Sequence, residues 1–189
     1  GTFYNYNNVG SELTAYILEQ VNNRSYKMQL QSFFDELGMK NTYLQEFDKH
    51  LSQLAKGYNK TNNEAPFSIN PLLGGSAGII TTLPDLMKFM KFQLESDNPL
   101  IKEATKVLFE DANDNIMGYL WQDLGFAKEE GFYYSKTGDT NGIKSGLLIC
   151  PDSNYGQIVI VNNQTEAANN DWGNLFNQIE TDLIKYPKI

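Results

Sequence analysis

The residues whose types could do chemistry form two clusters that lie far apart in the sequence. One cluster is Tyr6-Asn7-Asn8, just before the first predicted helix, and the other is Lys136-Thr137-Gly138, at the end of a predicted strand. A tyrosine hydroxyl ionises near pH 10, so a tyrosine that serves as a base near neutral pH needs a neighbouring cation or a shared proton relay. Lys136 is a candidate for that cation. Together, the two clusters could support proton transfer.

Each cluster alone also has a purely structural explanation. Tyr6 could be a buried aromatic side chain, Asn8 a turn residue, and Lys136 a charge that protects an edge strand from aggregation. Tripeptides of these types also recur by chance. The surroundings of each cluster therefore have to decide between the two explanations.

Other kinds of catalytic or binding site find little support in the sequence. One histidine, His50, and one cysteine, Cys150, cannot assemble a recognisable metal site, so we predict no metal. His50 is expected to be a solvated loop residue, and Cys150, within an apolar run, a packed thiol. The glycine-rich segment 74–78 fits neither a phosphate loop nor a dinucleotide pattern and predicts a close backbone crossing. We therefore expect no cofactor.

The composition excludes further classes of protein. A net charge of -8, from 23 acidic and 15 basic residues with no basic run, argues against a nucleic-acid partner. No apolar stretch approaches the roughly 20 residues that span a bilayer, so we predict no membrane span. With 41% hydrophobic residues, the chain has the composition of an ordinary globular protein.

The elements that must position the two clusters follow from periodicity and capping signals. Helical spacing predicts a helix capped by Ser11, a second between Ser25 and Gly38, and a third that begins after Thr82. A weaker helix is expected from Pro99 to Phe109. Segment 41–73 has no sustained period and predicts mostly loop, with a short helix near 46–54.

Beyond these helices the pattern changes to short apolar or aromatic runs separated by turn residues. Three antiparallel strands are predicted, over 131–135, 142–150 and 155–162, and the last two are joined by a hairpin at 151–154. An amphipathic helix around Trp172 and Phe176 could then cover a sheet face. The pattern indicates an α+β fold, with a mostly helical region over 1–125 and antiparallel strands plus a C-terminal helix over 126–189, both parts of one larger catalytic domain.

Several motifs, taken in order, resemble those of one family. The segment 1–8 resembles the Tyr-x-Asn segment of the penicillin-recognising serine hydrolases, which include class C β-lactamases and D-alanyl-D-alanine carboxypeptidases. Segments 36–42 and 55–58 are similar to that family's Leu-Gly-Met turn and Gly-Tyr element. Segment 74–89 is similar to its glycine-to-helix segment, and 136–145 to its Lys-Thr-Gly strand and following turn. The order and spacing agree over nearly the whole chain, which implies an incomplete β-lactamase/transpeptidase-like fold.

The resemblance implies a role for each residue in the two clusters. Tyr6 would pass a proton between a serine nucleophile and the leaving group, and Asn8 would hold the substrate amide and the motif lysine. Lys136 and Thr137 would grip the substrate carboxylate. In the same Lys-Thr-Gly strand, Gly138 would belong to the substrate-binding site. The backbone N–H of Asp139 would form half of an oxyanion hole, where one donor is typically worth about 3 kcal/mol of transition-state stabilisation.

One feature of the family is missing from this sequence. The family places its nucleophile in Ser-x-x-Lys, ahead of the tyrosine motif, and no serine among the 189 residues has a lysine three positions later. The resemblance therefore implies a C-terminal portion that lacks the nucleophile segment. We expect the chain alone to be inactive, and to need as partner either the missing N-terminal segment or another copy of itself.

Besides an unrelated α+β interaction domain, two functional hypotheses stay open at this point. The first is a fragment of an active serine hydrolase that acts on a D-alanyl peptide, a β-lactam or an ester, with a small molecule or peptide as substrate. The second is a non-catalytic pseudoenzyme that binds a peptide or protein in the same cleft. The lysine in Lys-Thr-Gly tilts slightly towards carboxylate-bearing substrates. The family alone implies a periplasmic or cell-surface location in a bacterium.

Overall fold

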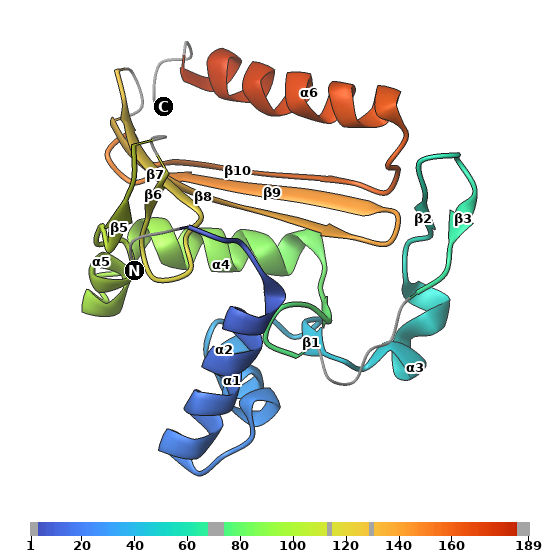
Figure 1. Ribbon diagram of the computed structural model, residues 1–189, viewed down its shortest axis with the longest axis horizontal. Coiled ribbons are helices and arrows are strands. Elements are labelled where there is room, and N and C mark those ends of the chain that lie inside the picture. The colour runs from blue at the N-terminus through green and yellow to red at the C-terminus, as the bar shows by residue number, and fades with distance from the viewer. Residues whose placement is uncertain (1–3, 68–73, 113–114, 129–130, 185–189) are drawn as a thin grey trace. The chain divides into compact units, whose positions relative to one another are not determined.

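The computed structural model describes residues 4–67, 74–112, 115–128 and 131–184. Its contacts divide into two units, which we call the helical unit (5–54 and 67–89) and the sheet unit (1–4, 55–66 and 90–189). The units interleave along the chain, and the division falls inside helix α4, Leu83–Glu95. Figure 1 shows the elements with the labels used below.

The helical unit contains α1 (Asn8–Asn22), α2 (Tyr26–Glu36), α3 (Phe47–His50), the 3-10 turn η1 (Leu51–Gln53) and the start of α4. Strands β1 (Tyr43–Leu44) and β4 (Ile79–Ile80) pair antiparallel within it. The cap at Ser25 is confirmed, because its side chain accepts a hydrogen bond from the N–H of Met28. Gly38 follows α2 with a φ of 68°, the left-handed conformation expected of a helix stop.

The start of α1 differs from the prediction. The helix begins at Asn8, because the side chain of Asn7 accepts a hydrogen bond from the N–H of Gly10 and caps the helix. Ser11 therefore lies inside the first turn. Any Ser, Thr, Asp or Asn can cap a helix, and the prediction of Ser11 as the cap is wrong.

The sheet unit is built on four antiparallel strands in the order β10-β9-β8-β7. They are β7 (Asp123–Ala127), β8 (Gly131–Thr140), β9 (Ile143–Cys150) and β10 (Tyr155–Val161). The three predicted strands and their hairpin are confirmed, and β8 runs five residues further than predicted. Strand β7 was missed, because its Asp and Gly residues depress strand propensity and its pairing with β8 is what makes it a strand.

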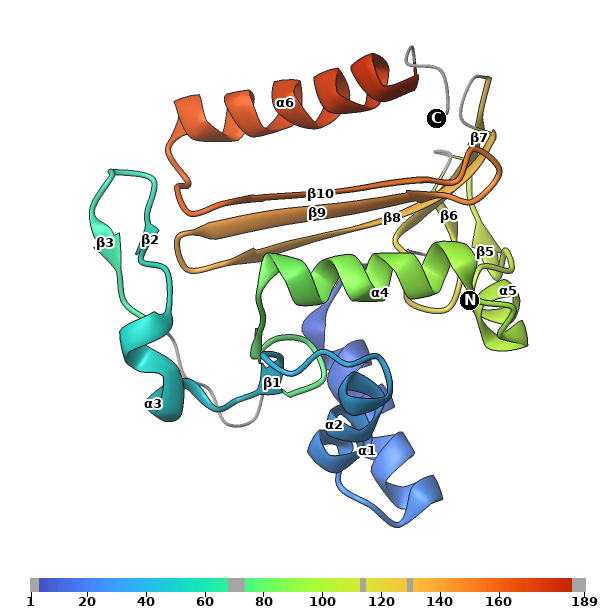
Figure 2. The ribbon, with the colours of Figure 1, turned by 180° about the vertical axis from the view of Figure 1, so that it is seen from behind.

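Helices cover both faces of this sheet (Figures 1 and 2). Helix α6 (Glu166–Ile184) lies against one face, where the indole N–H of Trp172 donates to the carbonyl of Val159. The other face carries the core of Leu124, Tyr134 and Ile149, against which Met90 and Leu94 of α4 pack. The predicted role of the C-terminal helix as a cover for the sheet is confirmed.

The remaining elements of the sheet unit are short. They are β2 (Gly57–Tyr58) paired with β3 (Glu64–Ala65), α5 (Pro99–Ala104), and β5 (Phe109–Glu110) paired with β6 (Ile116–Met117). The helix predicted to reach Phe109 ends at Ala104, and Phe109 is in a strand. Helical spacing of apolar residues over such a short segment does not distinguish a helix from a turn followed by a strand.

A tight backbone crossing ties the turn between β8 and β9 to β2. Gly142, at a φ of 77°, lies so close to Gly57 that an added Cβ would stand 2.5 Å from the Gly57 carbonyl carbon. The N–H of Tyr58 donates to the carbonyl of Gly142, and the amide oxygen of Gln164 accepts from the N–H of Gly142. The turn that follows Asp139 is therefore fixed by backbone contacts as well as by strand pairing.

Candidate functional site

The candidate site in the sheet unit is the exposed end of β8. Strand β7 pairs with β8 only as far as Ser135, and from Lys136 to Thr140 the pairing shown is with β9 alone. Residues 137–140 are exposed, whereas Lys136 is half-buried. Thr137, Gly138 and Asp139 thus lie together on an accessible strand edge, where side chains and backbone groups can meet a ligand.

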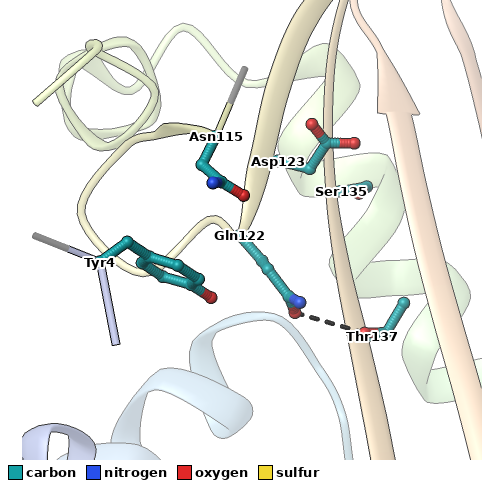
Figure 3. A pocket seen from close by; sticks show the side chains of 6 residues that line it. All are labelled: Tyr4, Asn115, Gln122, Asp123, Ser135 and Thr137. Atoms are coloured by element: carbon teal, nitrogen blue, oxygen red, sulfur yellow. Dashed lines mark hydrogen bonds between the residues drawn. The ribbon is translucent and has the colours of Figure 1, made fainter. Parts of the chain in front are cut away.

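One residue outside the predicted motifs holds this strand end together. The amide oxygen of Gln122 accepts hydrogen bonds from Nζ of Lys136, at 3.1 Å, and from Oγ1 of Thr137, at 3.2 Å. Lys136 Nζ also donates to the carbonyl of Thr137, at 2.7 Å. Figure 3 shows the Gln122 side chain extending along the strand to Thr137. The two side chains predicted to grip a carboxylate are therefore brought together.

A cavity of about 290 Å³ opens beside this strand end. Each residue of its lining carries a polar group: Tyr4, Asn115, Gln122, Asp123, Ser135 and Thr137 (Figure 3). Burial raises the pKa of the Asp123 carboxyl, and a hydrogen bond with Ser135 offsets only part of that rise. The cavity suits a small polar part of a ligand better than an apolar one.

Tyr6 and Asn8 belong to the helical unit, whereas Lys136, Thr137, Gly138 and Asp139 belong to the sheet unit. Tyr6 precedes α1, and 60% of its surface is exposed. It is therefore not the buried aromatic of the structural explanation. Asn8 is the exposed first residue of α1 and follows the capping residue Asn7, so a capped helix start fixes the backbone of this cluster.

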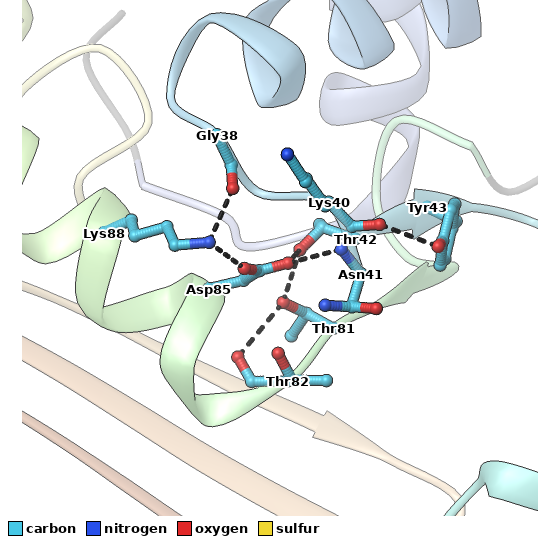
Figure 4. Close-up of polar contacts among 9 residues, drawn as sticks. All are labelled: Gly38, Lys40, Asn41, Thr42, Tyr43, Thr81, Thr82, Asp85 and Lys88. Carbon is cyan, nitrogen blue, oxygen red and sulfur yellow. Dashed lines mark hydrogen bonds and ion pairs between the residues drawn. The ribbon is translucent and has the colours of Figure 1, made fainter.

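A buried carboxylate organises the segment that follows α2 (Figure 4). Asp85 of α4, whose exposure is 1%, accepts from the N–H of Asn41 at 2.7 Å and the hydroxyl of Thr42 at 3.1 Å. Lys88 pairs with the same carboxylate at 2.7 Å and donates to the carbonyl of Gly38. Burial raises the pKa of Asp85, but the bonds from Lys88, Asn41 and Thr42 outweigh it, and the net pKa is lowered.

A second carboxylate fixes the glycine-rich segment. Glu12 of α1 accepts hydrogen bonds from the N–H of Gly75, at 2.9 Å, and from the N–H and hydroxyl of Ser76. A Cβ on Gly75 would stand 2.5 Å from the carbonyl oxygen of Ser11, which confirms the predicted close backbone crossing. Burial raises the Glu12 pKa. The hydrogen bonds from the Ser76 hydroxyl and the backbone N–H groups lower the pKa by more than burial raises it, so the net pKa is below the ordinary value.

The other titratable residues considered as candidates, Cys150 and His50, have structural roles. Cys150 is fully buried, as predicted. His50 ends α3, and its ring stacks on that of Tyr43 at a centroid distance of 4.3 Å, so the expectation of a solvated loop residue is wrong. Across the described ranges, no three His, Cys, Asp or Glu side chains are grouped to hold a metal ion. Nor does this part of the chain contain a helix that is both long and apolar enough to span a membrane.

Sequence reasoning missed Gln122, and a single glutamine carries no signal of its own. A usable signal would have been its place directly after Trp121, whose ring packs against that of Tyr134 at 4.5 Å. The N–H of Gln122 donates to the carbonyl of Ser135 at 3.1 Å, so the residue continues the pairing of β7 with β8. Recognising β7 as a strand would have placed Gln122 beside Lys136.

Comparison with known proteins shows one family over most of the chain. The family model described as Beta-lactamase matches residues 1–178. Protein flp of Staphylococcus aureus strain N315 is 25% identical over 178 residues, which cover 88% of this chain and 34% of that protein. The bovine mitochondrial serine beta-lactamase-like protein LACTB is also 25% identical, over 80% of this chain and 33% of that protein. The chain thus spans about a third of the length of these curated relatives.

Solved structures show the same fold. The D-alanine carboxypeptidase AmpC from Burkholderia cenocepacia superposes with a TM-score of 0.78 at 16% identity, over 87% of this chain and 57% of that one. A class C beta lactamase from Rhodobacter sphaeroides gives a TM-score of 0.77 at 18% identity, over 94% of this chain and 60% of that one. The predicted α+β architecture is confirmed as a part of that fold.

Proposed function

Because the chain belongs to the beta-lactamase family, we propose that it forms part of the catalytic domain of a serine hydrolase. The enzyme acts through an acyl-enzyme on a D-alanyl peptide, a β-lactam or an ester. The observation that carries this proposal is the strand end of β8, where Gln122 holds the ammonium of Lys136 and the hydroxyl of Thr137 side by side. A cation and a hydroxyl on an exposed strand edge suit the carboxylate of such a substrate.

The proposed roles follow the chemistry of each group. The serine oxygen attacks the substrate carbonyl, and Tyr6 receives its proton and passes it to the leaving group. Asn8 donates to the substrate amide. The N–H of Asp139 stabilises the oxyanion that develops on the carbonyl oxygen, and Gly138 leaves room for the substrate to approach the strand.

The nucleophile in this proposal comes from outside the 189 residues. No Ser-x-x-Lys occurs in them, and they correspond to about a third of each curated relative, 34% in one case. A segment that carries the motif, in the same polypeptide or from another copy, completes the site. The exposed apolar residues of α1, such as Val9 at 73% and Val21 at 75%, offer that segment a surface to pack on. The site would then work in the periplasm or at the surface of a bacterial cell.

The test is to assay the full-length protein with nitrocefin, a fluorescent penicillin and a p-nitrophenyl ester, and to detect the acyl-enzyme by intact mass. We expect acylation by at least one substrate, and none with residues 1–189 alone. Tyr6→Phe removes the proposed proton carrier and should lower turnover about 10²- to 10⁴-fold. Tyr16→Phe is the matched control, because Tyr16 is an exposed tyrosine of α1, 57% accessible, with no proposed catalytic role, and phenylalanine keeps its apolar ring.

Two outcomes would overturn the proposal. If no substrate acylates the full-length protein, the enzyme assignment fails, and binding of the same compounds without acylation would favour a pseudoenzyme. If Tyr6→Phe retains full turnover, as the control Tyr16→Phe should, Tyr6 is not the proton carrier.

A further inference from the structure

We propose that Gln122 is a positioning residue that orients Lys136 and Thr137 and so makes the site selective for carboxylate-bearing substrates. The inference rests on the proposed function, because it concerns the same strand end. Gln122 belongs to neither motif cluster of the sequence, and its amide oxygen contacts both of these side chains.

The chemistry of the donors determines how the Gln122 amide is oriented. An ammonium group can only donate hydrogen bonds, so the group that faces Lys136 Nζ must be the amide oxygen and not the amide nitrogen. That same oxygen accepts from Thr137 Oγ1. One acceptor therefore holds a cation and a hydroxyl group side by side. The hydroxyl has a single proton, so Thr137 donates to a substrate carboxylate by exchanging its bond to Gln122, while the ammonium of Lys136 supplies the charge.

Gln122 is itself held firmly enough for this task. Its N–H donates to the carbonyl of Ser135, and the neighbouring Trp121 ring packs edge-on against the fully buried Tyr134. Gln122 is half-buried, whereas Thr137 is exposed. The amide is thus anchored in the sheet, while Thr137 itself is accessible to a ligand.

The neutrality of Gln122 matters as much as its position. A carboxylate in its place would form an ion pair with Lys136 and compete with the substrate for the positive charge. An uncharged amide orients the ammonium without neutralising it. The cavity that Gln122 and Thr137 line also contains Asp123, so Lys136 supplies the positive charge beside an otherwise uncharged or acidic lining.

The test compares two acylating agents that differ only in the carboxylate, benzylpenicillin and its methyl ester, on the full-length protein. Gln122→Leu keeps the size of the side chain and removes the acceptor. We expect the acylation rate with benzylpenicillin to fall about tenfold, the value of one hydrogen bond to a charged group, with little change for the ester. Gln53→Leu, at an exposed position of η1, is the control and should change neither rate.

A structural readout separates orientation from folding. In protein with ¹³C-labelled lysine, Gln122→Leu should increase the mobility of the Lys136 side chain by NMR relaxation, and Gln122→Glu, which keeps acceptor oxygens, should restore its order. Thermal unfolding shows whether each variant is folded. Equal losses for benzylpenicillin and its ester, or unchanged mobility of Lys136, would overturn the assignment.

Failure of the proposed function leaves this assignment testable. If the wild-type protein is acylated by neither agent, the affinities for N-acetyl-D-alanine and N-acetyl-D-alaninamide are compared by NMR titration. Preference for the acid that is lost in Gln122→Leu supports the role of Gln122, and absence of any preference in the wild type refutes it.

Discussion

Replacing Asp85 with alanine is the sharpest test of how the helical unit is held together. The carboxylate is 1% exposed and accepts hydrogen bonds from Asn41, Thr42 and Lys88. Its lowered pKa means that these donors outweigh the cost of burying the charge. Asp85→Ala therefore removes a net stabilising group and leaves the donors without their shared acceptor.

The expected loss can be estimated bond by bond. Hydrogen bonds to a charged group contribute about 1.5–3 kcal/mol each. The bond from Thr42 is buried and the bond from Asn41 is part-buried. Thr42 retains its bond with Thr81, at 2.8 Å, which reduces its share. The Nζ of Lys88 is partly exposed and keeps the Gly38 carbonyl, so it adds less than about 1 kcal/mol. The total is about 3–5 kcal/mol of unfolding free energy.

Urea unfolding followed by far-UV circular dichroism measures this loss, and hydrogen exchange at the Asn41 amide locates it. The control is Glu95→Ala in the same helix, because Glu95 pairs with Lys91 at 3.6 Å on the exposed surface and should contribute less than about 0.5 kcal/mol. If Asp85→Ala costs no more than Glu95→Ala, or if the Asn41 amide exchanges as slowly as in the wild type, the network does not stabilise the unit.

Two further predictions concern glycine and acid. Gly142→Ala should lower the free energy of unfolding in urea by about 2–4 kcal/mol, because the new side chain is strained at a left-handed φ and clashes with the backbone of β2. The control Gly173→Ala in α6, with open space around it, should raise that free energy by up to about 1 kcal/mol. Equal effects of the two substitutions would show that the backbone of β2 does not pass close to Gly142. The folded state holds the Glu12 pKa below its ordinary value of 4.5 and so binds fewer protons than the unfolded state, which means that its contribution is present above that pH and is lost as the pH falls. Glu12→Gln should flatten the loss of stability measured by urea unfolding below about pH 5, and an unchanged pH dependence would show that Glu12 is not responsible.

Several elements of the fold could be predicted because their signals are local. Ser25 and Gly38 bracket α2 through a cap and a left-handed glycine, and both depend only on neighbouring residues. The hairpin at 151–154 follows from proline and Asx residues in the same way. Elements with contested local signals were less predictable, as the cap at Asn7 instead of Ser11 shows.

The residues of the candidate site also differ in whether a local sequence signal identifies them. Lys136 and Thr137 could be singled out because they form a contiguous motif, whereas Gln122 is 14 residues from Lys136 and lies beside it only through the pairing of β7 with β8. The helix after Thr82 could be predicted, but the bonds of its residue Asp85 to Asn41 and Thr42 span more than 40 residues. No local pattern encodes such a contact.

The sequence by itself determined the ordered motifs, the family resemblance and the residue types at the strand end, because these depend on identity and spacing along the chain. Only the tertiary structure decided which groups orient them. Strand pairing brought Gln122 to Lys136 and Thr137, and helix packing brought Asp85 to Asn41. The physical reason is that a buried or half-buried polar group needs a partner, and the partner is chosen by proximity in the folded chain and not by distance along the sequence.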